Sequence, residues 1–185
     1  MKYLVISDIH GSAESLEKVL TSFGKDADYL ILCGDYLNHG PRNPLPEGWA
    51  PKKVAEFLNQ NKNRIICVRG NCDAEVDEMV LEFPCLAAYT SIFDSGRRFF
   101  VHHGHLYNRE KLENWICRGT IIISGHTHVT VLEESNGYVY FNPGSISLPK
   151  CDDGKTCGFI EVKPDGKTTI SLCSIEGKLI KKLEC

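Results

Sequence analysis

The chain has 185 residues, of which 42% are hydrophobic and 24% are charged, and its formal net charge is −3. These values are typical of a single globular domain spanning residues 1–185, and they lack the basic excess expected of a protein that binds long nucleic acids. No apolar run reaches the roughly 20 residues that a membrane-spanning helix needs. Because no export signal is visible, we expect a cytoplasmic protein whose cysteines are reduced, none of them forming a C-x-x-C pair.

Strands and helices alternate along the first half of the chain. Short apolar runs predict buried strands, and segments with helical spacing of apolar residues predict the helices between them. Ser12 is a suitable cap for the first helix, Gly24 ends it, and Asp73 is interpreted as the cap of a later one. This alternation predicts parallel strands with right-handed crossovers. The predicted strands are residues 2–7, 29–33 and 64–68, and the predicted helices are residues 12–24, 50–60 and 74–80.

The second half is richer in strands. Ser135-Asn136-Gly137 is typical of a hairpin turn between two of them. A second sheet packed on the first would bury the inner faces of both, so the chain is expected to be an α/β protein, a four-layer α/β/β/α sandwich of two packed mixed sheets. The strands predicted in this half are residues 99–102, 120–124, 129–133, 138–141, 158–162, 168–173 and 178–183.

Polar motifs follow several of these strands. Asp8, Asp35 and Asn71 come after the three strands of the first half, and ligands bind beyond the carboxyl ends of such strands. Aspartate, asparagine and histidine are ligand types that two adjacent divalent cations can share. Taken singly, the aspartates could be helix caps and Asn71 a turn residue, but those roles leave the matching histidines unexplained. The motifs are Asp8-Ile9-His10-Gly11, Gly34-Asp35, Gly70-Asn71-Cys72-Asp73, His103-Gly104-His105 and Gly125-His126-Thr127-His128.

In this order the motifs resemble those of the calcineurin-like metallophosphoesterase superfamily, and most of all its small bacterial phosphodiesterases of the YfcE type. The resemblance implies the metallophosphoesterase fold and a dinuclear metal centre. It implies that Asp35 bridges two divalent cations, which we expect to be Mn²⁺, with Fe, Zn²⁺ or Ni²⁺ as alternatives. By the same resemblance, the ligands of the first metal are Asp8, His10 and His128, and those of the second are Asn71, His103 and His126.

The implied function is that of a cytoplasmic hydrolase, a metal-dependent phosphodiesterase that attacks small organic phosphodiesters with a hydroxide activated by two bridged metal ions. A phosphomonoesterase with the same site is one alternative. A non-catalytic scaffold resembling the retromer small subunit is another, although such a scaffold tends to lose the ligand histidines that this chain retains. No nucleic acid or membrane is expected as a partner, and the relatives make a homo-oligomer plausible.

Asp35, Asn71 and His105 are the predicted catalytic residues. Many superfamily members carry a histidine where this chain has Cys72, and a thiol is a poor substitute for an imidazolium acid. We therefore interpret His105 as the replacement acid or as a residue that holds a phosphate oxygen, with a role in orienting a metal ligand as an equally weighted alternative.

Two residues of the loop that follows Asp35 are candidates for substrate binding. His39 and Arg42 are assigned to bind the phosphate, with a solvated loop position as an equally weighted alternative. His102 precedes a ligand on a strand, so it should point to the opposite face, and it is left out of the site.

Overall fold

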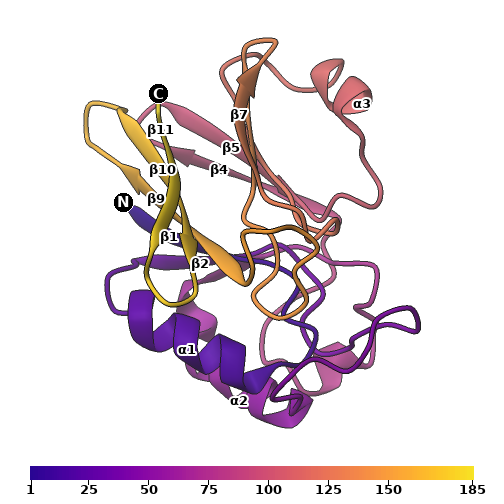
Figure 1. The fold of residues 1–185 in the computed structure, drawn as a ribbon. Helices are drawn as coiled ribbons and strands as arrows, with labels where there is room; N and C mark the ends of the chain where they lie inside the picture. Colours follow the sequence, from indigo (N-terminus) through magenta and orange to yellow (C-terminus); the bar gives the residue numbers. More distant parts are fainter.

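Two β-sheets lie face to face in the computed structural model, which describes residues 1–185 (Figure 1). The first sheet has the order β11-β10-β9-β1-β2-β3. Its parallel half joins β1 to β2 and β2 to β3, and its other half is antiparallel. The sheet is therefore mixed, as predicted. Its strands are β1 (Lys2–Ile6), β2 (Tyr29–Leu32), β3 (Ile65–Cys67), β9 (Thr156–Val162), β10 (Thr168–Ser174) and β11 (Leu179–Glu184).

The second sheet is also mixed and has the order β4-β5-β6-β8-β7. β5, β6 and β8 run parallel, while β4 and β7 pair antiparallel at the two edges. The predicted hairpin joins β7 to β8, and both Asn136 and Gly137 have positive φ, as a tight turn of this kind requires. The strands are β4 (Tyr89–Asp94), β5 (Arg97–His102), β6 (Ile121–Ile123), β7 (Val131–Ser135) and β8 (Tyr138–Asn142).

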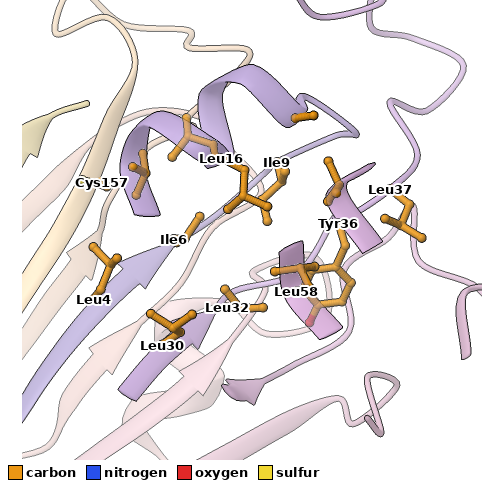
Figure 2. Close-up of a cluster of buried hydrophobic side chains, with 14 of the residues drawn as sticks. Leu4, Ile6, Ile9, Leu16, Leu30, Leu32, Tyr36, Leu37, Leu58 and Cys157 are labelled. Carbon is orange, nitrogen blue, oxygen red and sulfur yellow. The ribbon is translucent and has the colours of Figure 1, made fainter. Parts of the chain in front are cut away.

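Three apolar clusters separate the layers. The first lies between the six-stranded sheet and the helices α1 (Ala13–Phe23) and α2 (Pro51–Gln60), where Leu16 and Leu58 meet strand residues such as Leu32 (Figure 2). The second fills the space between the two sheets, and the third lies under the short helix α3 (Arg109–Glu113). Figure 1 shows α3 on the far side of the molecule from α1 and α2. The predicted four-layer sandwich is confirmed, with its fourth layer reduced to this one short helix.

The remaining differences from prediction concern short elements. Neither the edge strand β4 nor α3 was predicted, and the helix predicted for residues 74–80 is wrong: that segment holds only a single 3-10 turn, Asp77–Met79. Another 3-10 turn, Lys62–Arg64, precedes β3. Ser12 does cap α1, since its hydroxyl accepts a hydrogen bond from the amide of Ser15. None of the helices is both long and apolar enough to cross a bilayer.

Candidate metal centre

The candidate ligands converge where strands of both sheets end. Asp8, Asp35 and Asn71 follow β1, β2 and β3, whose parallel pairing brings their carboxyl ends to one edge. His103 follows β5, and His126 follows β6, which is parallel to β5. The facing sheets therefore contribute an oxygen-rich side and an imidazole-rich side to one site.

One tight group consists of Asp8, His10 and His128, all of them buried. The Nε2 atoms of His10 and His128 are 3.1 Å apart, and Asp8 Oδ1 lies 3.2 Å from Nε2 of His128. Asp8 Oδ1 is buried and has no hydrogen-bond partner. These are the three residues predicted to bind the first metal.

Asp35 connects this group to a second one. Its Oδ2 lies 3.7 Å from Nε2 of His10 and 3.5 Å from Nε2 of His103. Nε2 of His103 is in turn 3.1 Å from Oδ1 of Asn71. A single carboxylate thus faces imidazoles of both predicted metal sites, as a bridging ligand must.

The histidine tautomers are set by backbone carbonyls. Nδ1 of His10 donates to the carbonyl of Asn38 at 2.8 Å, and Nδ1 of His103 donates to that of Cys33 at 2.6 Å. Nδ1 of His128 donates in the same way to Leu148. In each neutral ring the lone pair is therefore on Nε2, which faces the centre. Carbonyl groups that orient imidazoles in this way are typical of metal sites.

The donor set fits a cation. Two imidazole nitrogens at 3.1 Å with their lone pairs facing one another need a shared proton or a cation between them, and the unpartnered Asp8 Oδ1 needs a positive partner. Although burial lowers the pKa of His103, the carboxylates of Asp35 and Asp8 and the carbonyl of Cys33 together more than offset this and raise it to about 9. A proton therefore occupies Nε2 when no metal does, and metal binding must release it.

Backbone strain is concentrated at the predicted ligands. Positive φ is rare for residues other than glycine and costs about 1–3 kcal/mol at each position. Asp8, His10, Asp35, His126 and His128 all adopt it, and outside the glycines only Ser95 and Asn136 do the same. Such strain persists only where the surrounding structure imposes it, and it accumulates at functional sites.

Neighbouring polar groups hold the strained loops in place. Asp73 is buried, and its carboxylate accepts hydrogen bonds from the backbone amides of Asp35, Tyr36 and Gly70 at 2.8, 2.8 and 2.6 Å. Burial and the charge of Asp35 raise the pKa of Asp73 to about 6, so the carboxylate is mostly ionised at pH 7. The predicted role of Asp73 as a helix cap is therefore wrong, because its oxygens bind the loop that carries Asp35.

Two serines fix the loop of the other aspartate. The hydroxyls of Ser145 and Ser147 both donate to the carbonyl of Asp8, at 2.8 and 2.9 Å. A glycine is also required at position 125, because a Cβ there would lie 1.9 Å from Oγ of Ser7. The roles of these residues in holding the loops could not be predicted from the sequence, since they depend on contacts between distant segments.

His126 and His105 lie beside the tight groups. The ring centroid of His103 is 5.1 Å from that of His126 and 5.2 Å from that of His105. The backbone amide of His126 donates to Oδ2 of Asp8, which ties the two predicted metal sites together. Nδ1 of His105 is buried without a hydrogen-bond partner, and burial together with the charge of His103 lowers the pKa of His105.

A polar cleft of about 350 Å³ opens over the centre and has no hydrophobic residue in its lining. Arg42, which was predicted to bind substrate, lines this cleft, but His39 is not part of its lining and instead packs edge-on against Trp49. Lys150 lines the cleft beside Arg42 and was not anticipated, because a lone lysine in a loop carries no motif. The complete lining is Asp35, Arg42, Asn43, Asn71, His126, Thr127, His128 and Lys150.

Cys72 lies at the edge of the centre. Its backbone amide donates to Oδ1 of Asp35 at 2.8 Å, and its side chain forms a compact group with His10 and Asp35. Burial, together with the nearby charge of Asp35, raises the pKa of the thiol to about 12. The thiol therefore stays protonated at neutral pH and is a very weak acid.

His102, by contrast, faces the α3 side of the second sheet, and its ring packs against Tyr107, as its exclusion from the site predicts.

The chain is similar to known phosphoesterases in both sequence and structure. The family model for the calcineurin-like phosphoesterase superfamily domain matches residues 1–165. The phosphodiesterase YfcE of Escherichia coli is 45% identical over 162 residues, which cover 87% of this chain and 88% of that protein. The solved structure of YfcE superposes with a TM-score of 0.92 at 40% identity, covering 99% of this chain and 98% of that one.

More distant structures share the fold. The zinc-complexed Vps29 of Entamoeba histolytica has a TM-score of 0.67 at 20% identity, and the match covers 100% of this chain and 99% of that one. At that level of identity the likeness is one of fold alone. A probable metallophosphoesterase of Bacillus subtilis, YsnB, is 28% identical over 177 residues, which cover 91% of this chain and 88% of that protein.

Proposed function

This chain belongs to the calcineurin-like phosphoesterase superfamily, and from that membership we propose that it is a metal-dependent phosphodiesterase acting on small organic phosphodiesters. The observation that carries the proposal is the position of Asp35, whose Oδ2 faces His10 on one side and His103 on the other. The polar cleft above it is large enough for a phosphate and small substituents. The relative named phosphodiesterase, YfcE, supports a diester as the substrate.

Each predicted ligand is assigned to one of two cations, except Asp35, which is assigned to both. Asp8, His10 and His128 would hold one cation, Asn71, His103 and His126 would hold the other, and Asp35 would bind both. Two such cations, which we propose to be Mn²⁺, lower the pKa of a shared water and neutralise charge on phosphoryl oxygens when they are bound. The carbonyls of Cys33, Asn38 and Leu148 keep three of the imidazoles in the tautomer that this requires.

The substrate would be oriented by the rim of the cleft. Arg42 and Lys150 are the two basic side chains in its lining, and a guanidinium and an ammonium can each bind a phosphoryl oxygen. His105 is not in the lining of the cleft, but its ring lies 5.2 Å from that of His103 beside the centre, and we assign it to the leaving-group oxygen. A diester carries one negative charge, so two basic side chains suffice to position it.

Replacing either basic residue should raise KM more than it lowers kcat. We expect Arg42→Ala and Lys150→Ala each to raise KM roughly fivefold, with kcat changed less, because an exposed charged hydrogen bond is worth about 1 kcal/mol. Steady-state kinetics of the metal-loaded enzyme measures this. Lys155→Ala is the matched control, since Lys155 pairs with Glu47 at 3.0 Å and does not line the cleft. A KM equal to that of the control would show that these residues do not bind the substrate.

His105→Ala tests the assignment of the acid. If His105 protonates the leaving oxygen, the variant should lose activity mainly on substrates with poor leaving groups, by about 100-fold or more. The loss on nitrophenyl esters should be small, because nitrophenolate leaves without a proton. The measurement is kcat across a series of aryl and alkyl methyl phosphates. An equal loss across the series would instead indicate that His105 positions the substrate.

A decisive experiment removes and restores the metal. Protein stripped by a chelator is assayed with bis(p-nitrophenyl) phosphate and p-nitrophenyl phosphate before and after Mn²⁺ is added. We expect no turnover without metal and a preference for the diester with it. A preference for the monoester would make the enzyme a phosphomonoesterase with the same site. Binding of two metals without turnover of either compound would favour a non-catalytic scaffold.

A further inference from the structure

A second polar hollow adjoins the cleft over the centre. It measures about 410 Å³ and is lined by residues of two segments, 38–43 and 71–72. Arg42, Asn43 and Asn71 line both spaces, so the hollow and the cleft meet along these three side chains. The mechanism proposed above places the phosphate in the cleft and makes no use of the hollow, which we call the Asn38 hollow.

The side-chain amide of Asn71 stands between the centre and the Asn38 hollow. Its Oδ1 lies 3.1 Å from Nε2 of His103, and its Nδ2 donates to Sγ of Cys72 at 3.2 Å. Cys72 lines the hollow and packs against Gly40, where φ is +77° and a Cβ would lie 2.8 Å from Sγ. Position 40 therefore requires glycine, and this packing holds the two lining segments together beside the centre.

Two further amides of the Asn38 hollow are oriented by the loop and keep one free end each. Asn38 accepts the backbone amide of Gly40 with Oδ1 at 2.8 Å, which leaves its Nδ2 without a partner. Asn43 donates with Nδ2 to the carbonyl of His39 at 2.8 Å, which leaves its Oδ1 without one. Both free atoms can be reached from solvent, because Asn38 is exposed and Oδ1 of Asn43 is not buried. One oriented donor and one oriented acceptor therefore line the same hollow.

These two groups select a ligand by hydrogen bonding. A hydroxyl group both donates and accepts, so two neighbouring hydroxyls can bind a donor and an acceptor at once. A hydrocarbon would displace the water that solvates the two amides and would replace none of its hydrogen bonds. Pro41 is the one apolar residue in the lining, so an apolar group gains little from burial there. The Asn38 hollow thus favours a hydroxylated group over an aromatic or aliphatic one.

A phosphodiester needs two spaces for its two ester groups. With the phosphate over the centre, one ester group can extend along the cleft, and the other needs a second space that begins at the phosphate. The Asn38 hollow is such a space, because it meets the cleft at Arg42, Asn43 and Asn71. Building on the proposed phosphodiesterase function, we propose that the Asn38 hollow binds one ester group of the substrate, a small polyol or a single sugar ring, through Asn38 and Asn43. A cavity of about 150 Å³ holds benzene, so 410 Å³ has room for such a group.

Binding can be measured with probes that the enzyme cannot hydrolyse. 3,4-Dihydroxybutylphosphonate and butylphosphonate share a phosphonate group and a four-carbon chain joined through a P–C bond, and they differ only in two hydroxyls. Each is titrated into Mn²⁺-loaded protein and followed by isothermal titration calorimetry. We expect the dihydroxy probe to bind roughly tenfold tighter, because it alone forms hydrogen bonds with the two asparagines. Equal affinity of the two probes, or binding of neither, would overturn the proposal.

Variants of the two asparagines locate the hydroxyls. Asn38→Ser keeps an oxygen that can accept the amide of Gly40 but removes the free donor, so it should reduce the preference about threefold. Asn43→Ala should have a similar effect, and the double variant should abolish the preference while its affinity for butylphosphonate stays unchanged. Asn63→Ala is the matched control, since Asn63 is exposed and lines neither the cleft nor the hollow. A preference that survives in the double variant would place the hydroxyls elsewhere and contradict the proposal.

Failure of this proposal and failure of the proposed function give different results, because the probes are not substrates. A protein that prefers the dihydroxy probe through Asn38 and Asn43 but hydrolyses no diester would support the Asn38 hollow as a binding site and contradict the proposed activity. A protein that hydrolyses bis(p-nitrophenyl) phosphate but binds both probes equally would retain the activity and overturn the assignment of the hollow.

Discussion

Asp35→Asn is expected to lower kcat by at least about a hundredfold and to leave the protein with fewer than two bound metals per chain. The carboxylate faces imidazoles of both proposed metal sites, so loss of its charge should weaken metal binding at both. An amide nitrogen at the position of Oδ1 would also oppose the backbone amide of Cys72, which donates there at 2.8 Å. Turnover of bis(p-nitrophenyl) phosphate and metal content by mass spectrometry measure the two effects.

The control for this variant is Asp94→Asn. Asp94 is also a strand-end aspartate with a buried partner, since its Oδ2 accepts from the hydroxyl of Tyr3 at 3.0 Å, but it is absent from the metal centre. We expect it to retain full activity and two metals. Normal activity in Asp35→Asn would contradict the assignment of the bridging ligand.

Asp73→Asn should destabilise the protein although Asp73 contacts no substrate. The three amides that its carboxylate binds are held by two oxygens, and an asparagine replaces one of them with a donor. We expect a loss of about 2–4 kcal/mol in the free energy of unfolding, because at least one buried amide is left facing another donor. Urea denaturation of metal-stripped protein measures this without a contribution from metal affinity.

The activity of Asp73→Asn should fall together with its stability. Asp73 binds the backbone of Asp35, so the variant is expected to lose at least about tenfold in kcat through displacement of the bridging carboxylate. Asp77→Asn is the matched control, because Asp77 accepts only the amide of Ala74 and lies apart from the centre. Equal stability and activity of the two variants would show that Asp73 does not position Asp35.

Regular patterns in the sequence predicted most of the fold. The strands that precede Asp8, Asp35 and Asn71 are short apolar runs, which are conspicuous in the sequence although β3 is only half-buried. β4 escaped prediction because it is an edge strand whose Tyr89 and Phe93 remain exposed, so its pattern does not alternate between core and solvent. α3 has only five residues, fewer than two turns, which is too short for a helical period to be recognised.

The helix predicted after Asp73 does not form, and the reason is different. Its apolar residues Val76, Met79 and Val80 are exposed, so no core face stabilises a helix there. Asp73 itself looks like a cap in the sequence, but its carboxylate binds amides 3, 37 and 38 residues away. In the site, the motifs bring Asp8, His10, Asp35, His103 and His128 into groups of three that could hold a metal ion, but His126 belongs to none of these groups. Lys150 and the position of His39 follow from loop packing that no motif encodes.

The left-handed backbone at the five strained ligand residues has a consequence for engineering. Glycine adopts this conformation without penalty, so a glycine at Asp8, His10, Asp35, His126 or His128 would remove about 1 kcal/mol or more of backbone strain at each position. Each such change would also delete a ligand side chain. At Asp8 and Asp35 the change would leave the backbone amides of His126 and Cys72 without their acceptors, which costs about as much as the relieved strain, so the strained backbone is held by the packing of the centre as well as by the need for ligands.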